Sequence, residues 1–148
     1  MIDYRPTIVD KADAKPLTVT KGALRYEDVS FSYGEGIAAL SGVTIEARPG
    51  QKIALVGPSG AGKSTIFQLL LRFFDPSSGQ VTLDGRDLRD LEREEFRKSL
   101  ALVPQDPVIF ADTARENIRF GRPDATDAEV EEAARAAAAH DFLTALPD

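Results

Sequence analysis

Residues 57–65, with the sequence G-P-S-G-A-G-K-S-T, restrict the possible folds of this chain more than any other stretch. They fit the pattern G-x-x-x-x-G-K followed by Ser or Thr, which is typical of loops that bind phosphate groups. The apolar run 52–56 before the loop predicts a buried strand, and the run 66–74 after it predicts a buried helix. A glycine-rich turn between a strand and a helix directs several backbone N–H groups at one point, where the helix N-terminus adds partial positive charge. The stretch therefore predicts a polyphosphate-binding loop in an α/β fold.

The individual residues of the loop suit this chemistry. Gly57, Gly60 and Gly62 permit backbone angles and close approaches that a side chain would forbid. Lys63 supplies a mobile cation for the terminal phosphates, and Ser64 offers a hydroxyl to Mg²⁺, a hard ion that prefers oxygen ligands. The predicted nucleotide-binding residues of the loop are Gly57, Pro58, Ser59, Gly60, Ala61, Gly62, Lys63, Ser64 and Thr65.

Composition excludes several other classes of protein. The 148 residues suffice for one domain with a hydrophobic core. No apolar run approaches the ~18 residues of a membrane-spanning helix, so we expect no transmembrane segment in this chain. The chain has no cysteine and one histidine, which argues against disulfides, thiolate metal sites and a histidine-centred triad. The net charge of −6 argues against nucleic acid as a partner.

The order of predicted elements places an antiparallel β layer before the loop. Residues 1–22 contain two prolines and no sustained periodicity, and we interpret them as a linker. The stretches 23–31 and 40–47 have the pattern of strands, separated by a glycine turn at 34–36.

Short elements are predicted after the loop. A strand is expected at 80–83 and another at 101–103, with a charged helix between them at 91–100, capped near Asp90. Thr113 and Glu116 have the spacing of a capping box and predict a helix over 113–120. A last helix, rich in alanine and glutamate, should begin at Thr126 or Asp127 and reach Ala139.

These motifs, taken in order, resemble the first part of an ATP-binding cassette (ABC) nucleotide-binding domain of the exporter class, from Leu24 to the end of the chain. Residues 29–33, V-S-F-S-Y, resemble the segment that stacks on adenine, with Tyr33 as the stacking ring. Residues 102–106, L-V-P-Q-D, resemble the Q-loop, in which Gln105 would contact Mg²⁺ and the attacking water. Residues 108–121 resemble the segment that receives a coupling helix of the membrane domain, although Phe110 and Ile118 have the alternative of lying in the core.

The resemblance implies a fold and a set of partners. The fold would be α/β, a P-loop NTPase core with an N-terminal antiparallel β layer. Residues 1–22 would be a linker from a preceding membrane domain, and residues 23–148 would form part of the nucleotide-binding domain. The cofactors would be ATP and Mg²⁺. The partners would be the transmembrane domain of the same transporter, contacted from about Phe110 to Gly121, and a second nucleotide-binding domain in a dimer. Such a protein works on the cytoplasmic face of the inner membrane.

Several catalytic elements of the family are missing from this sequence. An L-S-G-G-Q signature, a Walker B aspartate, the following glutamate and a switch histidine have no counterpart, and His140 comes too early to be that histidine. Since phosphoryl transfer needs an oriented and polarised water, we expect ATP binding with weak or no hydrolysis by this chain alone. Two alternatives are a non-catalytic nucleotide-binding fragment or split-gene module, and a small P-loop kinase. The arginines at 86, 89, 93 and 97 alternate with acidic residues, which favours helix-face ion pairs over a kinase lid.

Overall fold

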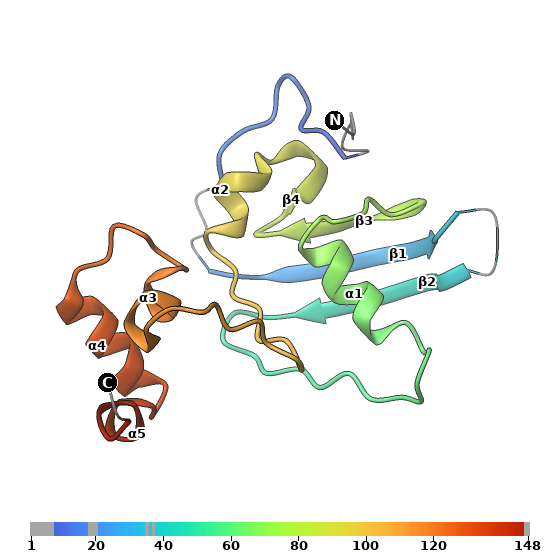
Figure 1. Cartoon of the computed structure of the whole chain (residues 1–148). Helices are drawn as coiled ribbons and strands as arrows, with labels where there is room; N and C mark the ends of the chain where they lie inside the picture. Colours follow the sequence, from blue (N-terminus) through green and yellow to red (C-terminus); the bar gives the residue numbers. More distant parts are fainter. Residues whose placement is uncertain (1–7, 18–20, 35, 37, 147–148) are drawn as a thin grey trace, which may run out of the picture. The chain divides into compact units, whose positions relative to one another are not determined.

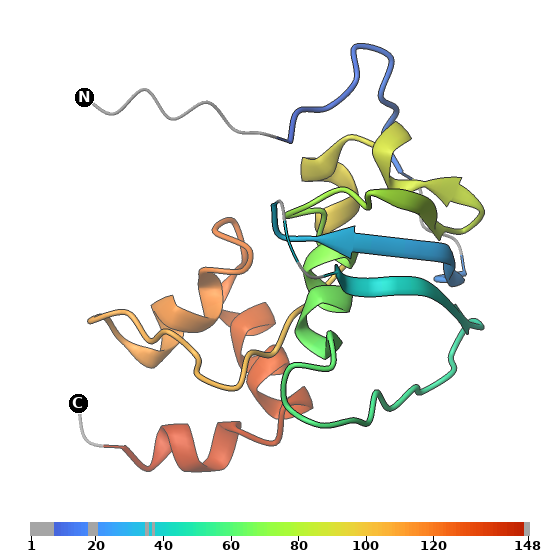
Figure 2. The same ribbon diagram turned by 90° about the vertical axis from the view of Figure 1, so that its right-hand side faces the viewer.

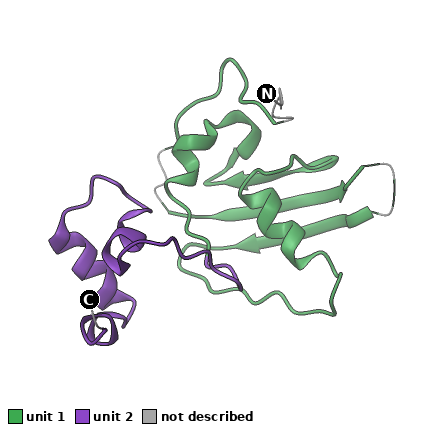
Figure 3. Ribbon diagram, in the orientation of Figure 1, with its two compact units in different colours: residues 1–102 green, residues 103–148 purple. Residues whose placement is uncertain are grey.

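A computed structural model describes residues 8–17, 21–34, 36 and 38–146 of the chain. The chain separates into two compact units, residues 1–102 and residues 103–148 (Figure 3). The first unit contains the β layer and the phosphate loop, and the second contains three helices. The predicted turn at 34–36 and parts of the predicted linker include positions outside the described residues, and the linker boundary stays a prediction.

The sheet of the first unit consists of β1 (Leu24–Ser32), β2 (Ala38–Ala47), β3 (Ser78–Leu83) and β4 (Arg86–Asp87). All neighbouring strands are antiparallel, in the order β2-β1-β3-β4 (Figure 1). The predicted strands 23–31, 40–47 and 80–83 are therefore confirmed, each with slightly different ends. This sheet is the antiparallel β layer that the sequence predicts beside the phosphate loop.

One helix, α1 (Lys63–Leu70), covers a face of this sheet, as two perpendicular views show (Figures 1 and 2). Its buried Leu69 packs with Tyr26, Val29 and Val81 of the sheet. The buried Tyr26 hydroxyl donates a 2.8 Å hydrogen bond to the carbonyl of Ile66, and burial raises the pKa of this phenol, which keeps it a donor. The β layer thus fixes the helix by both apolar packing and a buried hydrogen bond.

The helix is shorter than the apolar run 66–74 predicts. It begins at Lys63 and ends at Leu70, and Phe67 and Phe73 are exposed. The helix cannot continue because Arg72 has a φ of +52°, outside the right-handed helical region. The predicted helix to residue 74 is therefore wrong at its C-terminal end.

Two predicted strands do not form within the described part of the chain. Residues 52–56 and 101–103 have no strand pairing, and Val56 and Val103 are 93% and 92% exposed. A strand exists only through hydrogen bonds to a neighbouring strand, and an apolar run does not specify that neighbour. The predictions of a buried strand at 52–56 and of a strand at 101–103 are corrected accordingly.

The predicted charged helix at 91–100 is also shorter in the structure. A 3₁₀ turn, η1 (Leu88–Asp90), comes first, and α2 (Arg93–Arg97) follows with Glu92 rather than Asp90 as its N-cap. The Asp90 side chain instead binds the ammonium of Lys11 at 2.5 Å. A contact far apart in sequence has thus replaced the local cap that the sequence suggests.

The second unit contains α3 (Ala114–Arg119), α4 (Asp127–Ala136) and α5 (His140–Thr144). The Thr113 hydroxyl caps α3 as predicted. The full capping box occurs instead at the start of α4, where Thr126 and Glu129 bind each other's backbone N–H groups. Helix α4 ends before the predicted Ala139 because Ala138 has a φ of +54°. None of the helices in the described ranges is long and apolar enough to cross a membrane.

Candidate functional site

The phosphate loop turns sharply into α1 at Gly62. This residue is the N-cap of the helix and has a φ of +80°. A Cβ atom built on Gly62 would lie 2.6 Å from the carbonyl oxygen of Ala39 and 2.7 Å from Cδ2 of Leu40, both in β2. Only glycine fits this position, since the backbone angle disfavours a side chain and β2 leaves no space for one. Gly60 shares the φ of +80° but has open space around it.

The Lys63 ammonium lies over the loop itself. Its Nζ donates to the carbonyl oxygens of Gly57 and Pro58 at 2.8 and 2.6 Å. The backbone N–H groups of the first turn, from Lys63 to Thr65, have no acceptor within the helix. The lysine charge and the positive end of the helix dipole therefore coincide at one exposed loop, which is the electrostatic requirement for binding an anion.

The remaining loop residues are placed as a binding surface requires. Gly57, Pro58, Ser59, Gly60 and Ala61 are exposed, and so is Ser64. The side chain of Thr65, in contrast, is buried. The Thr65 hydroxyl is therefore not available to a ligand.

Tyr33, the predicted stacking residue, lies beside the first turn of α1. Its hydroxyl lies 3.0 Å from Oγ1 of Thr65 and donates to Oε1 of Gln68. Its ring contacts the rings of Phe31 and Phe74 edge-on, with centroids 4.8 and 5.3 Å away. The tyrosine is 54% exposed, so an aromatic surface remains accessible next to the phosphate loop.

Gln68 is a residue of this site that the sequence reasoning missed. It lies one turn after Thr65 on the same face of α1, and both bind the Tyr33 hydroxyl. The i, i+3 spacing from Thr65 was a signal that could have indicated it, since such pairs share a helix face. The two side chains orient Tyr33 relative to the loop.

Gln105, the predicted contact to Mg²⁺ and water, belongs to the second unit. It is exposed in the irregular stretch before α3. The structure therefore brings Tyr33 and the phosphate loop together within one unit, while the predicted role of Gln105 stays a prediction.

The segment predicted to receive a coupling helix is compact around one asparagine. The Asn117 side chain accepts from the backbone N–H of Phe110 at 2.8 Å and donates to the carbonyl of Phe110 at 3.1 Å. The rings of Phe110 and Phe120 lie 4.6 Å apart, and both side chains are exposed. The alternative of a core position for Phe110 is therefore excluded, and Ile118 is half-buried.

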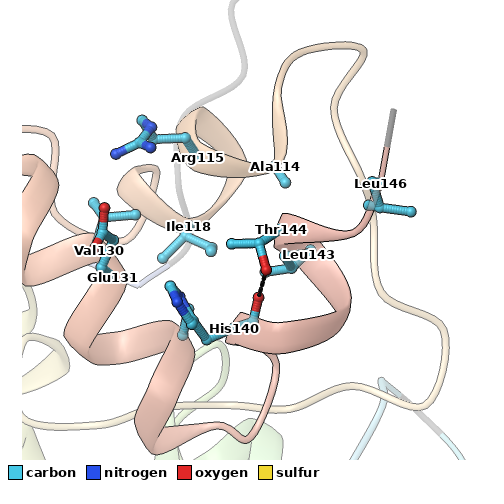
Figure 4. A pocket seen from close by; sticks show the side chains of 10 residues that line it. Ala114, Arg115, Ile118, Val130, Glu131, His140, Leu143, Thr144 and Leu146 are labelled. Atoms are coloured by element: carbon cyan, nitrogen blue, oxygen red, sulfur yellow. Dashed lines mark hydrogen bonds between the residues drawn. The ribbon is translucent and has the colours of Figure 1, made fainter. Parts of the chain in front are cut away.

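The second unit has a cavity of about 230 Å³ between α3, α4 and α5 (Figure 4). Ile118, Val130 and Leu143 provide apolar walls, and His140 and Thr144 line it from α5. The Thr144 hydroxyl donates to the carbonyl of His140 at 3.1 Å, a bond internal to the helix. No group of three or more acidic, histidine or cysteine side chains that could hold a metal occurs among the residues described.

Three of the four arginines in the charged run bind partners within the first unit. Arg89 forms an ion pair with Asp87, and Arg93 forms one with Asp10. Arg97 donates to the backbone carbonyls of Leu71 and Arg72. The predicted local ion pair therefore forms at Arg89, whose partner Asp87 is one of the interleaved acidic residues, whereas Arg93 and Arg97 bind partners outside the charged run.

Comparison with known proteins identifies the family of the chain. Residues 40–147 match the family described as ABC transporter. The chain is 48% identical over 141 residues to ATP-binding cassette sub-family B member 6 of Mus musculus, covering 95% of this chain and 17% of that protein. It is 44% identical over 148 residues to the heavy metal tolerance protein of Schizosaccharomyces pombe, covering all of this chain and 18% of that protein.

A solved structure extends the agreement to the fold. A bacterial Atm1-family ABC exporter with ATP bound matches with a TM-score of 0.92 and 42% identity, over 99% of this chain and 26% of that one. The chain thus spans between about a sixth and a quarter of the length of these relatives. The family match covers well over half of the chain, and it includes the loop, α1 and all three helices of the second unit. The chain belongs to the ABC transporter family.

Proposed function

We propose that this chain binds ATP at residues 57–65 as part of the ATPase domain of an ABC exporter, and that hydrolysis in the longer protein powers export. The observation that carries the proposal is the coincidence of the Lys63 ammonium with the N-terminus of α1 at an exposed loop. The relatives support it, because they include an exporter whose structure contains ATP.

The residues of the loop suit a nucleotide with Mg²⁺. Backbone N–H groups and Lys63 would hold the phosphates, and the hydroxyl of the exposed Ser64 is an oxygen donor of the kind that Mg²⁺ prefers. When bound, the ion would neutralise phosphate charge during phosphoryl transfer. Tyr33 would hold the adenine ring, and Gln105 would assist at the metal and the water.

The proposed partners follow from the exposed apolar surface of the second unit. Val108, Ile109, Phe110 and Phe120 are exposed, and the Asn117 side chain binds the backbone N–H and carbonyl of Phe110. An apolar surface on a rigid segment suits the coupling helix of a transmembrane domain. A second nucleotide-binding domain would complete a dimer at the cytoplasmic face of the membrane.

We expect the 148-residue chain to bind Mg-ATP saturably and to hydrolyse it no faster than a Lys63→Ala variant. Binding needs only the loop and Tyr33, whereas turnover needs a group that polarises the attacking water, which the sequence lacks. Isothermal titration calorimetry measures the first, and phosphate release measures the second. AMP, which lacks the terminal phosphates, is the control ligand. Equal affinity for ATP and AMP would refute the proposed site, and turnover above the Lys63→Ala rate would refute the prediction on hydrolysis.

Tyr33→Ala should weaken ATP binding about tenfold, because stacking of a base on an aromatic ring contributes roughly 1–3 kcal/mol. Tyr33→Phe should stay within about threefold of the unaltered chain, since it loses only the hydroxyl contacts to Thr65 and Gln68. Inorganic tripolyphosphate, which has no base, should bind all three proteins equally. If Tyr33→Ala weakens tripolyphosphate as much as ATP, Tyr33 acts on the helix and not on the base.

A further inference from the structure

Arg72 is a buried charge at the C-terminal end of the helix that begins at the phosphate loop. The residue is 2% exposed. Its Nε donates to Asp75 at 3.0 Å, and its Nη1 donates to Asp10 at 3.1 Å and to the carbonyl of Leu91 at 3.2 Å. Its Nη2 donates to the carbonyl of Val9 at 3.4 Å. A buried guanidinium needs such partners, because an unpaired charge in the interior is strongly destabilising.

Asp10 is shared between two arginines. Besides Arg72, it accepts from Nε of Arg93 at 2.7 Å and from the backbone N–H of Arg93 at 3.1 Å. Arg93 in turn donates to the carbonyl of Ile8 at 2.6 Å. Burial raises the pKa of Asp10, but the hydrogen bonds from Arg93 and the charges of both arginines outweigh it and hold the pKa below its usual value. One carboxylate therefore joins residues 8–17, the end of α1 and the start of α2.

Further contacts attach residues 8–17, here called the N-terminal segment, to the residues just before α2 (Figure 1). Lys15 pairs with Leu91 in a parallel bridge, in which the Lys15 N–H donates to the carbonyl of Asp90 and the Glu92 N–H donates to the carbonyl of Lys15, both at 3.0 Å. The segment predicted as part of a linker is thus attached to the first unit at several points.

Helix α1 connects the attached N-terminal segment with the loop 57–65. Helix α1 spans Lys63–Leu70, about 12 Å at 1.5 Å per residue, with Gly62 at one end and Arg72 just beyond the other. Arg97 binds the carbonyls of Leu71 and Arg72 and lies over the Phe73 ring, 5.1 Å from its centroid. A helix fixed at its C-terminal end presents its N-terminal N–H groups in a fixed direction.

We propose that Asp10 is a positioning residue for the phosphate loop, which acts through Arg72 to set the orientation of α1. Attachment of the N-terminal segment and binding of nucleotide should then strengthen each other, because coupling between two sites is reciprocal. The proposal rests on the proposed function, in that the loop must bind ATP. Nucleotide binding would thereby strengthen the attachment of residues 8–17 to the first unit.

Asp10→Asn tests the proposal, with Asp13→Asn as its matched control. Asp13 lies in the same segment, is exposed, and forms no hydrogen bond or ion pair with the described residues. Asp10→Asn should weaken Mg-ATP binding at least fivefold in calorimetry, the lower end of typical coupling between sites. Asp13→Asn should bind like the unaltered chain.

Hydrogen exchange of the unaltered chain supplies a second measurement that needs no variant. Mg-ATP should slow exchange at the amides of residues 8–15, and AMP should not. If Asp10 has only a structural role, Asp10→Asn will lower the melting temperature without changing the affinity for Mg-ATP. That result would overturn the proposal. Unchanged exchange in the segment on saturation with Mg-ATP would overturn it too, even if Asp10→Asn does not fold. If the unaltered chain binds no ATP, the proposed function fails, and this inference fails with it.

Discussion

Lys63→Ala should weaken the binding of Mg-ATP by about 100-fold. The Lys63 ammonium lies within hydrogen-bonding distance of the loop carbonyls of Gly57 and Pro58, so its charge is already directed into the loop. Hydrogen bonds to charged groups contribute roughly 1.5–3 kcal/mol each, and two such bonds to phosphate oxygens, taken at the lower end of this range, correspond to about two orders of magnitude in affinity. Calorimetric titration with Mg-ATP measures the change.

Lys52→Ala is the matched control for this prediction. Lys52 is exposed in the run before the loop and forms no hydrogen bond or ion pair with the described residues. It carries the same charge but should change the affinity less than about threefold, since an exposed charge outside the loop is screened by solvent and salt. Similar losses in the two variants would show that net charge, and not the position of Lys63, governs binding.

Gly62→Ala should lower the free energy of unfolding by about 3 kcal/mol or more, from the combined costs of a left-handed backbone angle and of overpacking. Its Cβ would lie 2.6 Å from the carbonyl oxygen of Ala39, and neither backbone can move without disturbing β2 or the start of α1. Chemical denaturation followed by circular dichroism measures this loss. Nucleotide binding should be lost as well, because the added methyl group would push the loop away from β2.

Gly60→Ala separates the two causes. Gly60 has the same φ of +80°, but its Cβ would have no neighbour within 4 Å. The free energy of unfolding of this variant should fall only by the cost of the backbone angle, about 1–2 kcal/mol. The difference between the two variants is then the energy of the contact with β2. Equal losses would mean that the loop shifts freely away from Ala39.

Local sequence predicted the parts of the molecule that depend on local interactions. The phosphate loop followed from its glycines, and strands β1, β2 and β3 followed from alternation and turns. The cap at Thr113 and the start of α4 at Thr126 followed from short-range hydrogen bonds within one helical turn. The two caps depend on residues within a few positions of one another, whereas the strands also need partners far apart in the sequence, as the pairing of Leu24 with Leu83 shows.

The predictions that were wrong depend on partners far apart in the sequence. The apolar run to residue 74 predicted a helix, but Arg72 leaves the helical conformation and binds Asp10, 62 residues earlier. Asp90 was expected to cap a helix, but it binds Lys11 instead. The runs 52–56 and 101–103 have the composition of strands, and composition does not say which strand would pair with them.

The sequence indicated the residues of the candidate site but not all of the contacts between them. The loop sequence predicted which residues would contact phosphate, and the family resemblance predicted Tyr33 as the stacking ring; both roles stay predictions, although the structure places Tyr33 beside the first turn of α1. The bond from Tyr33 to Gln68 was not predicted, because it joins the end of one strand to a helix 35 residues later.

The contacts of the tyrosines with α1 give the chain an optical reporter of its own. The sequence has no tryptophan and three tyrosines, so its near-ultraviolet absorption and emission are dominated by phenol rings. Both tyrosines that the structure describes touch this helix, Tyr26 through the carbonyl of Ile66 and Tyr33 through Thr65. A movement of α1 on ligand binding would change the polarity and hydrogen bonding of these rings, and stopped-flow fluorescence could follow it in real time without an attached dye.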